Sequence, residues 1–329
     1  MVLQPIPQIA DIEAAASRIS GFAVRTPLIE SAALNELTGG RILLKAECLQ
    51  RTGSFKFRGA WNKISQLDAR AHRGGVVAYS SGNHAQGVAA AAQLKGIPAL
   101  IVMPSDTPLI KQNNTRGYGA EVVLYERGRE SREEIARRIT DERGAVLVPP
   151  FEDTDIIAGQ GTSGLEIAEQ AENLGAKPDA ILVSASGGGL AAGIALAAEA
   201  LLPESAVYSV EPEGFDDYAR SLASGRRQRN EQVSGNICDA LMSQEPGETT
   251  FEINRTRLKS GLVVNEAEVK HAMRFGFETL KLVIEPGGSV ALAAVLAGKI
   301  PTRGKVIVAV ISGGNVDGGM FARVLSEKI

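Results

Sequence analysis

Short apolar runs rich in β-branched residues recur along the chain, separated by polar and glycine-containing stretches. The runs are nearly continuous rather than alternating, which is typical of parallel strands that are covered on both faces. We therefore expect strands at residues 76–80, 99–103, 121–124, 145–148, 180–184, 206–210 and 305–311.

Alanine-rich stretches between these runs predict helices. We expect helices at residues 85–95, 129–143, 162–174, 190–202 and 266–282. The repeated strand–helix–strand order predicts an α/β protein with open sheets, in which ligands lie beyond the carboxyl ends of the strands. A glycine pair at 74–75 and a proline pair at 149–150 indicate two domain boundaries. They predict a large domain of residues 1–75 and 151–329, with residues 76–150 inserted as a small mobile domain.

Length and charge narrow the class of protein. The chain has 329 residues, enough for two domains, and a formal net charge of -3 at pH 7. This balance provides no basic field for a nucleic acid or an anionic membrane surface. No apolar run approaches the roughly 20 residues that span a bilayer. Cys48 and Cys238 lie far apart without a CxxC pattern, which is typical of free thiols in a cytoplasmic protein.

The stretch SFKFRGA at residues 54–60 contains Lys56, the lysine of greatest chemical interest. Apolar neighbours such as Phe55 and Phe57 favour the neutral amine by disfavouring the ammonium form. A neutral lysine can form a Schiff base with a phosphorylated carbonyl cofactor. Taken alone, the stretch is better explained by a solvated lysine on a helix surface.

A polar turn, YSSGNHAQG at residues 79–87, follows one predicted strand and opens the next helix. Backbone N–H groups at a helix start bind anions, so a substrate carboxylate could dock there. Asn83 could hydrogen-bond a ring hydroxyl, and the hydroxyl of Ser81 could carry a proton. Helix capping by Ser80, Ser81 or Asn83 is the structural alternative, and it is compatible with carboxylate binding.

A glycine-rich turn follows the strand predicted at 180–184. It consists of Ser186, Gly187, Gly188, Gly189 and Leu190. Three consecutive glycines allow the backbone to wrap around an anion at the start of a helix, and a phosphate is the expected ligand. The pattern is neither a Walker loop nor GxGxxG. A tight strand–helix turn is the alternative, although such turns seldom need three glycines.

Ser312 follows the strand predicted at 305–311, in the sequence ISGGN. Its hydroxyl could hydrogen-bond a ring nitrogen at the strand end. Taken alone, this segment is better explained as an ordinary turn.

Glu211 and Asp217 lie six residues apart across a loop that contains a proline and a glycine. Two carboxylates and an intervening carbonyl suit a hard cation with oxygen ligands, such as Mg²⁺ or Ca²⁺. From the residues alone, a solvated acidic loop is the better explanation.

Together these motifs resemble the fold-type II pyridoxal-phosphate enzymes, in the branch of threonine dehydratase, serine racemase and 3-hydroxyaspartate dehydratase. The resemblance extends over nearly the whole chain, from RTPL at 25–28 through IAGQGT at 157–162 and EPGG at 285–288 to SGGN at 312–315. It implies the tryptophan synthase β-like fold, with two open, mostly parallel α/β sheets and a small domain inserted in a larger one. It also implies a homodimer.

The resemblance assigns roles to the motif residues. Lys56 would carry pyridoxal 5'-phosphate as a Schiff base, with Phe55 packed beside the ring. Asn83 would contact the ring hydroxyl and Ser312 the pyridine nitrogen. The backbone of residues 186–190 would hold the phosphate, and Ser186, which replaces the first of the family's four glycines, leaves these donors intact. The substrate carboxylate would be bound by Ser80, Ser81, Gly82, Asn83 and His84.

The implied activity is that of a dehydratase, or ammonia-lyase, which converts L-threonine, L-serine or a related β-hydroxy amino acid to a 2-oxo acid and ammonia. Lys56 would be the general base at Cα. Ser81, where threonine dehydratases usually have alanine, keeps a serine racemase open as an alternative. Arg132 stands where serine racemase carries an arginine and could bind the second carboxylate of 3-hydroxyaspartate, although it could also be one of several surface arginines.

The acidic loop also fits the resemblance. A structural cation, Mg²⁺ or Ca²⁺, would be held by Glu211, the carbonyl of Phe215 and Asp217. By analogy, Phe151 and residues 234–242 would shape the pocket for the substrate side chain.

Overall fold

The architecture is that of a computed structural model, which describes residues 4–107, 109–126 and 128–327. Residues 1–3 and 328–329, at the two ends of the predicted large domain, lie outside the described residues. The same holds for residues 108 and 127 within the predicted small domain.

The larger sheet has six strands in the order β1-β2-β10-β7-β8-β9. Its strands are β1 (Leu28–Glu30), β2 (Arg41–Lys45), β7 (Ala180–Ser184), β8 (Ala206–Pro212), β9 (Leu258–Val264) and β10 (Val306–Val310). β1 pairs with β2 antiparallel, and every other neighbouring pair is parallel. Val308 of β10 pairs with Leu43 and Ile181 on one face of the sheet, and the next residue, Ala309, pairs with Leu44 and Leu182 on the other face. All six side chains are buried. The centre of this sheet is therefore covered on both faces, as the continuous apolar runs predict.

The smaller sheet has four parallel strands in the order β5-β4-β3-β6. Its strands are β3 (Val76–Tyr79), β4 (Ala99–Pro104), β5 (Glu121–Tyr125) and β6 (Val146–Leu147). Each strand overlaps one of the four expected between residues 76 and 148, so a separate sheet in this segment is confirmed. The domain boundaries themselves stay a prediction.

Helices flank both sheets. They are α1 (Ile9–Ile19), α2 (Ala32–Thr38), α3 (Lys56–Ser65), α4 (Asn83–Lys95), α5 (Leu109–Gly117), α6 (Arg132–Arg143), α7 (Thr154–Asn173), α8 (Gly189–Leu201), α9 (Asp217–Ser224), α10 (Glu248–Arg257), α11 (Glu266–Phe275), α12 (Pro286–Leu296) and α13 (Gly318–Ser326). Shorter helical turns are η1 (Glu47–Leu49), η2 (Arg51–Gly53), η3 (Asp239–Leu241) and η4 (Gly276–Leu280). Within the described ranges, no helix has the length and apolar character needed to cross a bilayer.

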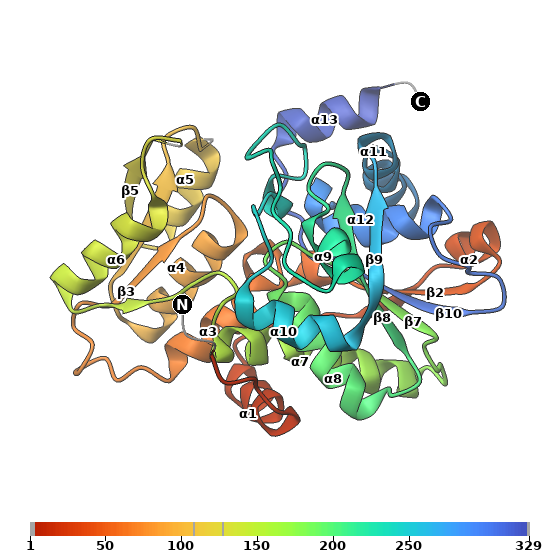
Figure 1. The fold of residues 1–329 in the computed structure, drawn as a ribbon, viewed down its shortest axis with the longest axis horizontal. Helices are drawn as coiled ribbons and strands as arrows, with labels where there is room; N and C mark the ends of the chain where they lie inside the picture. Colours follow the sequence, from red (N-terminus) through yellow and green to blue (C-terminus); the bar gives the residue numbers. More distant parts are fainter. Residues whose placement is uncertain (1–3, 108, 127, 328–329) are drawn as a thin grey trace.

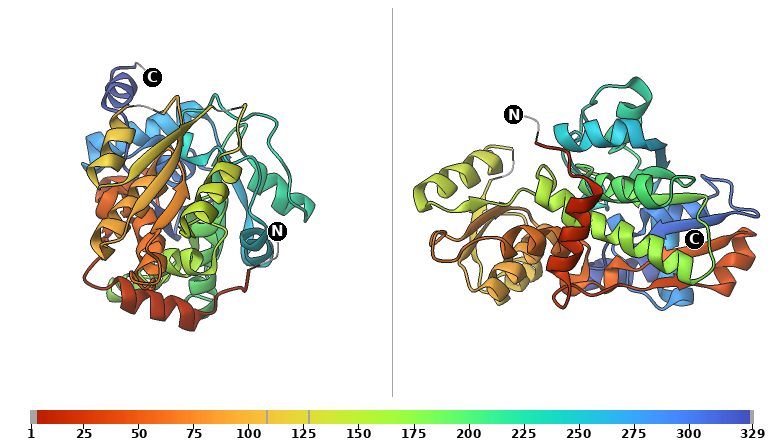
Figure 2. Two further views of the ribbon diagram at one scale, coloured as in Figure 1. Left: turned by 90° about the vertical axis from the view of Figure 1, so that its left-hand side faces the viewer. Right: turned by 90° about the horizontal axis from the view of Figure 1, so that it is seen from below.

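The two sheets lie side by side. Figure 1 shows β3 and β5 with α4, α5 and α6 on the left, and the strands of the larger sheet on the right. In the right-hand view of Figure 2, α1 crosses the molecule where these two parts meet and runs along α7. The indole N–H of Trp61 in α3 donates to the carbonyl of Arg18 in α1, at 3.1 Å, which ties the N-terminal helix to α3.

Three strands of the larger sheet were missed by the apolar pattern. β9 is an edge strand whose residues are mostly half-exposed or exposed, so it contains polar positions such as Lys259 and Ser260. β2 begins at Arg41 and ends at Lys45, so only three of its residues form an apolar run. β1 has only three residues and lies at the opposite edge. Strands at sheet edges and strands with charged ends do not produce the continuous apolar run that identifies a central strand.

Helix α7 begins at Thr154, eight residues before the predicted start at 162. The Asp153 carboxylate caps the helix by accepting from the backbone N–H groups of Asp155 and Ile156. The intervening glycines concealed the helix, because glycine has a low helix propensity. One of these glycines allows α7 to pack closely against α3.

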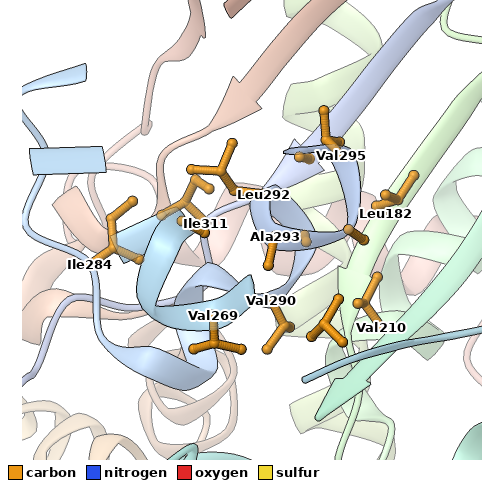
Figure 3. Close-up of a cluster of buried hydrophobic side chains, with 14 of the residues drawn as sticks. Leu182, Val210, Val269, Ile284, Val290, Leu292, Ala293, Val295 and Ile311 are labelled. Carbon is orange, nitrogen blue, oxygen red and sulfur yellow. The ribbon is translucent and has the colours of Figure 1, made fainter. Parts of the chain in front are cut away.

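The main hydrophobic cluster lies between the larger sheet and α12. Figure 3 shows Leu182 of β7 and Val210 of β8 together with Val290 and Ala293 of α12. A second cluster covers the smaller sheet and includes Phe57 and Trp61 of α3. Helix α3 therefore connects the two parts of the molecule through its packing.

Candidate active site

A cavity of about 330 Å³ lies between the two sheets and is lined by residues from both. Its walls contain the turns that follow β3, β7 and β10, so it lies beyond the carboxyl ends of these strands, as expected. The predicted cofactor and substrate residues that line it are Phe55, Lys56, Ser80, Ser81, Gly82, Asn83, His84, Arg132, Ser186, Gly187, Gly188, Gly189, Leu190 and Ser312. The fold therefore gathers this whole set in one place. Glu211, Phe215 and Asp217 do not line the cavity.

Lys56 is the first residue of α3, and its partly buried side chain lines the cavity. Its Nζ donates to the carbonyl oxygen of Pro150 at 2.8 Å and lies 5.0 Å from the centre of the Phe55 ring. Burial lowers the pKa of Lys56 to about 8. Lys56 therefore lies in the cavity wall and not on a solvated helix surface, and the lowered pKa favours the neutral amine more than in a free lysine.

The backbone entering α3 is attached to the turn after β10. Ser54 forms an isolated β-bridge with Gly313, and the Phe55 N–H donates to the Ser312 carbonyl at 3.1 Å. These contacts place Lys56 beside Ser312, although they are far apart in the sequence.

Helix α3 also packs closely on α7 through two glycines. A Cβ atom at Gly159 would lie 2.6 Å from the Cα of Gly59, too close for any side chain. The Gly59 N–H donates to the Gln160 side chain at 3.3 Å. This close approach explains why glycines occur in RGA at 58–60 and GQGT at 159–162. The two segments pack against each other and hold the helix that begins with Lys56.

Four buried or nearly buried charges hold Arg58 of α3 in place, and none of their contacts was predicted from the sequence. Arg58 pairs with Glu47 at 2.8 Å and with Glu166 at 2.7 Å, and Lys45 pairs with Glu166 at 2.6 Å. The side chains of Lys45, Glu47 and Arg58 have no exposed surface. Two positive and two negative charges compensate one another, so the cluster anchors the residue two positions after Lys56 without a net buried charge.

The glycine-rich turn presents backbone donors to the cavity. Helix α8 begins at Gly189 after Gly188, which provides no capping side chain. Among the hydrogen bonds of the described residues, none uses a backbone N–H of residues 187–190 as donor. Such uncapped N–H groups at a helix start are a suitable site for a phosphate, so the turn fits the predicted role.

Side chains of α9 and α10 hold the glycine turn from behind. The Gly187 carbonyl accepts from the Thr250 hydroxyl, and the Gly188 carbonyl accepts from Asn254 Nδ2 at 3.2 Å. Because a trans peptide directs its N–H opposite to its carbonyl, these contacts turn the next N–H groups toward the cavity. Gly188 has a φ of +91°, and a Cβ there would lie 2.0 Å from the hydroxyl of Tyr218. Glycine is therefore required at this position for packing as well as for ligand access.

Ser312 lies at the carboxyl end of β10, next to the end of β7. The Ser184 hydroxyl donates to Ser312 Oγ at 3.0 Å. Ser312 retains its own hydroxyl hydrogen, which could be donated to a ring nitrogen in the cavity.

The residues predicted to bind the substrate carboxylate lie at the start of α4 and line the cavity. None of the predicted capping side chains caps α4, because Gly82 is its N-cap residue. The Gly82 N–H itself donates to Ser80 Oγ at 3.2 Å. The imidazole of His84 lies 2.9 Å from the carbonyl of Val148, and burial together with nearby Lys56 lowers the pKa of His84 to about 3. His84 is thus neutral and oriented by the backbone, which leaves its main-chain N–H as the donor for a carboxylate.

Arg132 is the first residue of α6 and reaches the cavity from the smaller sheet. Its guanidinium lies 5.4 Å from the centre of the Tyr79 ring and pairs with Glu133 at 2.8 Å. Phe151 also lines the cavity, and from the segment predicted at 234–242 only residues 239–242 do so.

The two carboxylates at the ends of the acidic loop are buried, so the alternative of solvated carboxylates is wrong for Glu211 and Asp217. Glu211 and Asp217 have no exposed surface, and Phe215 is almost completely buried. Glu211 accepts the N–H groups of Tyr218 and Ala219 at 2.8 and 2.7 Å. Asp217 accepts from Asn230 at 2.6 Å through one oxygen, whereas its Oδ2 is buried without a partner among the described residues.

Burial, with the neighbouring Asp217, raises the pKa of Glu211 well above its usual range, and burial raises the pKa of Asp217 to about 7. The described part of the chain contains no group of three or more His, Cys, Asp or Glu side chains arranged for a metal. A cation here would depend on two carboxylates and a carbonyl.

The fold and the cavity are those expected of an enzyme with a phosphorylated carbonyl cofactor, because a lysine and a glycine-rich turn line the same cavity. The chain belongs to the family described as "Pyridoxal-phosphate dependent enzyme", which matches residues 19–313. This membership confirms the resemblance seen in the sequence, and pyridoxal phosphate is the cofactor of the family.

The chain is similar to several proteins of one branch. An L-threo-3-hydroxyaspartate ammonia-lyase of Pseudomonas sp is 44% identical over 315 residues, which cover 96% of this chain and 97% of that protein. An L-threonine ammonia-lyase of Thermotoga maritima is 43% identical, over 97% of this chain and 78% of that protein. The structure of maize serine racemase matches with a TM-score of 0.91 and 38% identity, over 97% of each chain. The predicted fold, that of the fold-type II pyridoxal-phosphate enzymes, is thereby confirmed.

Proposed function

We propose that the chain is an ammonia-lyase that converts L-threonine, L-serine or a related β-hydroxy amino acid to a 2-oxo acid and ammonia. The observation that carries the proposal is the buried Lys56 amine in the same cavity as the uncapped N–H groups of residues 187–190. The ammonia-lyases among the similar proteins support it.

The proposed cofactor contacts follow from the donors in the cavity. Residues 186–190 would hold the phosphate, Ser312 would face the pyridine nitrogen, and Phe55 would lie beside the ring. When bound, pyridoxal phosphate supplies an electron sink that stabilises negative charge at the substrate Cα. Ser312 is a neutral hydroxyl rather than a carboxylate, which moderates that sink.

The chain's own residues would bind the substrate and move the proton. The N–H groups at the start of α4, with the Ser80 and Ser81 hydroxyls, would bind the substrate carboxylate. Lys56, whose burial favours the neutral amine, would remove the Cα proton. Loss of the β-hydroxyl and hydrolysis of the released enamine would then yield the 2-oxo acid and ammonia.

A panel of β-hydroxy amino acids tests the proposal. We expect L-threonine, L-serine or 3-hydroxyaspartate to yield a 2-oxo acid and ammonia with the purified holoenzyme. Lys56→Ala should abolish this activity while leaving the fold intact by circular dichroism. Full activity of Lys56→Ala would contradict the proposal.

Serine racemase is the second candidate, and Ser81 is the observation that favours it. Ser81 lines the same cavity as Lys56, so its hydroxyl could carry a proton to the same Cα. With L-serine as substrate, D-serine and pyruvate are measured together in wild type and Ser81→Ala. If the protein is mainly an ammonia-lyase, the wild type forms more pyruvate than D-serine. If Ser81 carries the proton for racemisation, the rate of D-serine formation in Ser81→Ala falls at least about tenfold more than the rate of pyruvate formation. Equal or greater D-serine in the wild type would make racemisation the main activity.

A 3-hydroxyaspartate ammonia-lyase is a third candidate. Arg132 in the cavity wall supplies a guanidinium that could pair with the second carboxylate of that substrate. The similar Pseudomonas protein carries that name.

We also propose a structural Mg²⁺ or Ca²⁺ held by Glu211, the Phe215 carbonyl and Asp217. The buried and unpartnered Asp217 Oδ2 supports this site, because a buried carboxylate oxygen needs a compensating partner. The cation would be structural, since none of these residues lines the cavity.

We further propose that the protein is a cytoplasmic homodimer. We also propose that residues 76–150 form a small mobile domain. The two free thiols, Cys48 and Cys238, support the location. Light scattering tests the dimer, and crystals with and without substrate test the domain motion; an unchanged cavity would contradict it.

A further inference from the structure

Three polar side chains and one backbone carbonyl form a continuous chain of hydrogen bonds in the wall of the cavity. Asn83 Nδ2 donates to Glu285 Oε1 at 2.6 Å. Asn315 Nδ2 donates to Asn83 Oδ1 at 2.8 Å and to the Thr52 carbonyl at 2.7 Å. These residues come from four separate elements: the start of α4, the N-cap of α12, the turn after β10 and η2. Asn83, Glu285 and Asn315 all line the cavity.

The direction of this chain follows from the Thr52 carbonyl, which can only accept a hydrogen bond. The Asn315 atom that faces it must therefore be the amide nitrogen. The same nitrogen faces Asn83, so the Asn83 atom at 2.8 Å must be the oxygen. The nitrogen of Asn83 is then directed to Glu285. The orientation of Asn83, which is otherwise ambiguous for an amide, is thus determined by its neighbours.

One hydrogen of the Asn83 amide remains after these contacts. An amide nitrogen carries two hydrogens, and Glu285 takes one of them. The amide oxygen accepts from Asn315 through one of its two lone pairs. The free N–H of this side chain is therefore the donor that a ligand in the cavity can meet.

The surrounding backbone is shaped to keep this arrangement. A Cβ atom at Gly313 would lie 2.1 Å from Glu285 Oε1 and 3.2 Å from Asn83 Nδ2, so a side chain there would displace the contact. The Glu285 N–H donates to the Gly313 carbonyl at 3.2 Å. Glu285 itself is only 3% exposed, which makes it a buried carboxyl with a fixed position.

We propose that Glu285 and Asn315 are positioning residues that hold the Asn83 amide as an N–H donor toward the ring hydroxyl of the cofactor. The proposal rests on the proposed function, which places that hydroxyl at Asn83. A fixed donor stabilises the ionised oxygen over the neutral hydroxyl, so the two residues set the affinity for the cofactor and its absorption spectrum through Asn83.

Substitutions that reverse or release the amide test this inference. Asn315→Asp keeps the size of the side chain but places oxygens against Asn83 Oδ1 and the Thr52 carbonyl, which favours a reversed Asn83. Glu285→Leu removes the acceptor for Asn83 Nδ2. Glu285→Gln is the matched control, because its amide oxygen can still accept from Asn83.

The readouts are the dissociation constant of pyridoxal phosphate from apoprotein and the pH midpoint of the visible absorption band. One lost hydrogen bond to a charged oxygen corresponds to roughly tenfold or more in affinity. We expect Asn315→Asp and Glu285→Leu to lose about as much as Asn83→Ala, and Glu285→Gln to stay within about twofold of wild type. Adding either substitution to Asn83→Ala should cause little further loss, because both act through the same amide.

If Asn315→Asp and Glu285→Leu bind pyridoxal phosphate with the affinity and spectrum of the wild type, the inference is overturned. It is also overturned if their losses of affinity add fully to the loss caused by Asn83→Ala. If these variants do not fold, a neutron structure of the wild-type apoprotein decides the question. It is expected to show Asn83 deuterons facing Glu285, and the reverse orientation would overturn the inference. A wild-type protein that forms no covalent adduct at Lys56 would instead contradict the proposed function.

Discussion

Lys56 Nζ donates a 2.8 Å hydrogen bond to the carbonyl oxygen of Pro150. Lys56 begins α3, whereas Pro150 lies between β6 and α7, so the amine is held where the smaller sheet returns to the rest of the chain. No carboxylate of the described residues forms an ion pair with this amine. Burial therefore dominates, and it lowers the pKa of Lys56 to about 8.

The rate of covalent cofactor attachment should follow the neutral fraction of this amine. We expect the rate constant to rise about tenfold per pH unit below pH 8 and to level off above it, because the lowered pKa releases the proton there. Stopped-flow absorbance of apoprotein mixed with pyridoxal phosphate measures the rate, and Lys56→Arg is the control without a covalent phase. A rise that continues to pH 10.5, the ordinary lysine value, would contradict the assignment.

Replacing Arg58 by Met should destabilise the protein strongly. The substitution leaves the buried Glu47 carboxylate without its main partner, and breaking a buried pair in this way costs about 3–5 kcal/mol. Urea unfolding of the apoprotein measures the free energy of unfolding. Arg138→Met is the matched control, because Arg138 is 66% exposed and should change that free energy by no more than about 0.5 kcal/mol. Equal effects of the two substitutions would show that the charge cluster does not anchor α3.

Arg132→Ala should separate the possible substrates. If Arg132 pairs with the second carboxylate of 3-hydroxyaspartate, kcat/KM for that substrate should fall by about 10–100-fold, as for a lost charged hydrogen bond. The value for L-threonine, which lacks this carboxylate, should change less than about threefold. Arg138→Ala on the same helix should leave both unchanged. Equal losses for the two substrates would reject a special role for Arg132.

The stability of the protein should depend on divalent cations more at high pH than at low pH. The raised pKa of Asp217 means that its carboxyl group stabilises the fold below the ordinary value of 3.8 and that this stability is lost as the pH rises through about 7. Glu211 adds to the effect in the same direction. A cation at these carboxylates would offset the loss where both are ionised.

Melting temperatures of the apoprotein with Mg²⁺, Ca²⁺ or EDTA at pH 5 and pH 8 measure this effect. We expect a clear increase with a cation at pH 8 and little at pH 5. Asp217→Asn should remove the difference. Equal shifts at both pH values, or a shift that persists in Asp217→Asn, would contradict a cation at this site.

The central strands and the cavity-lining turns were predictable because their signals are local. β7 and β10 are continuous apolar runs, and the Ser186 and Ser312 turns follow them directly in the sequence. A strand buried on both faces has almost no alternative composition, and a glycine-rich turn at its end has few structural uses.

The support of the site could not be predicted in this way. Arg58 reaches Glu166 across 108 positions, and Asn83 reaches Glu285 across 202. Arg58 and Glu166 look like ordinary surface residues in their own segments, and nothing in the sequence around Asn83 indicates its contact with Glu285, because burial and pairing arise only when distant elements pack together. The burial of Asp217 could not be predicted for the same reason, since it is not visible in the neighbouring residues.

Mapping the residue that binds pyridoxal phosphate covalently is the most direct test of the role of Lys56. Purified holoenzyme is reduced with borohydride, digested and mapped by mass spectrometry, with Lys63, at the end of the same helix, as the internal comparison. We expect to find the pyridoxyl group on Lys56 and to find Lys63 unmodified. An unmodified Lys56 in a protein that has retained its colour and fold would contradict that role.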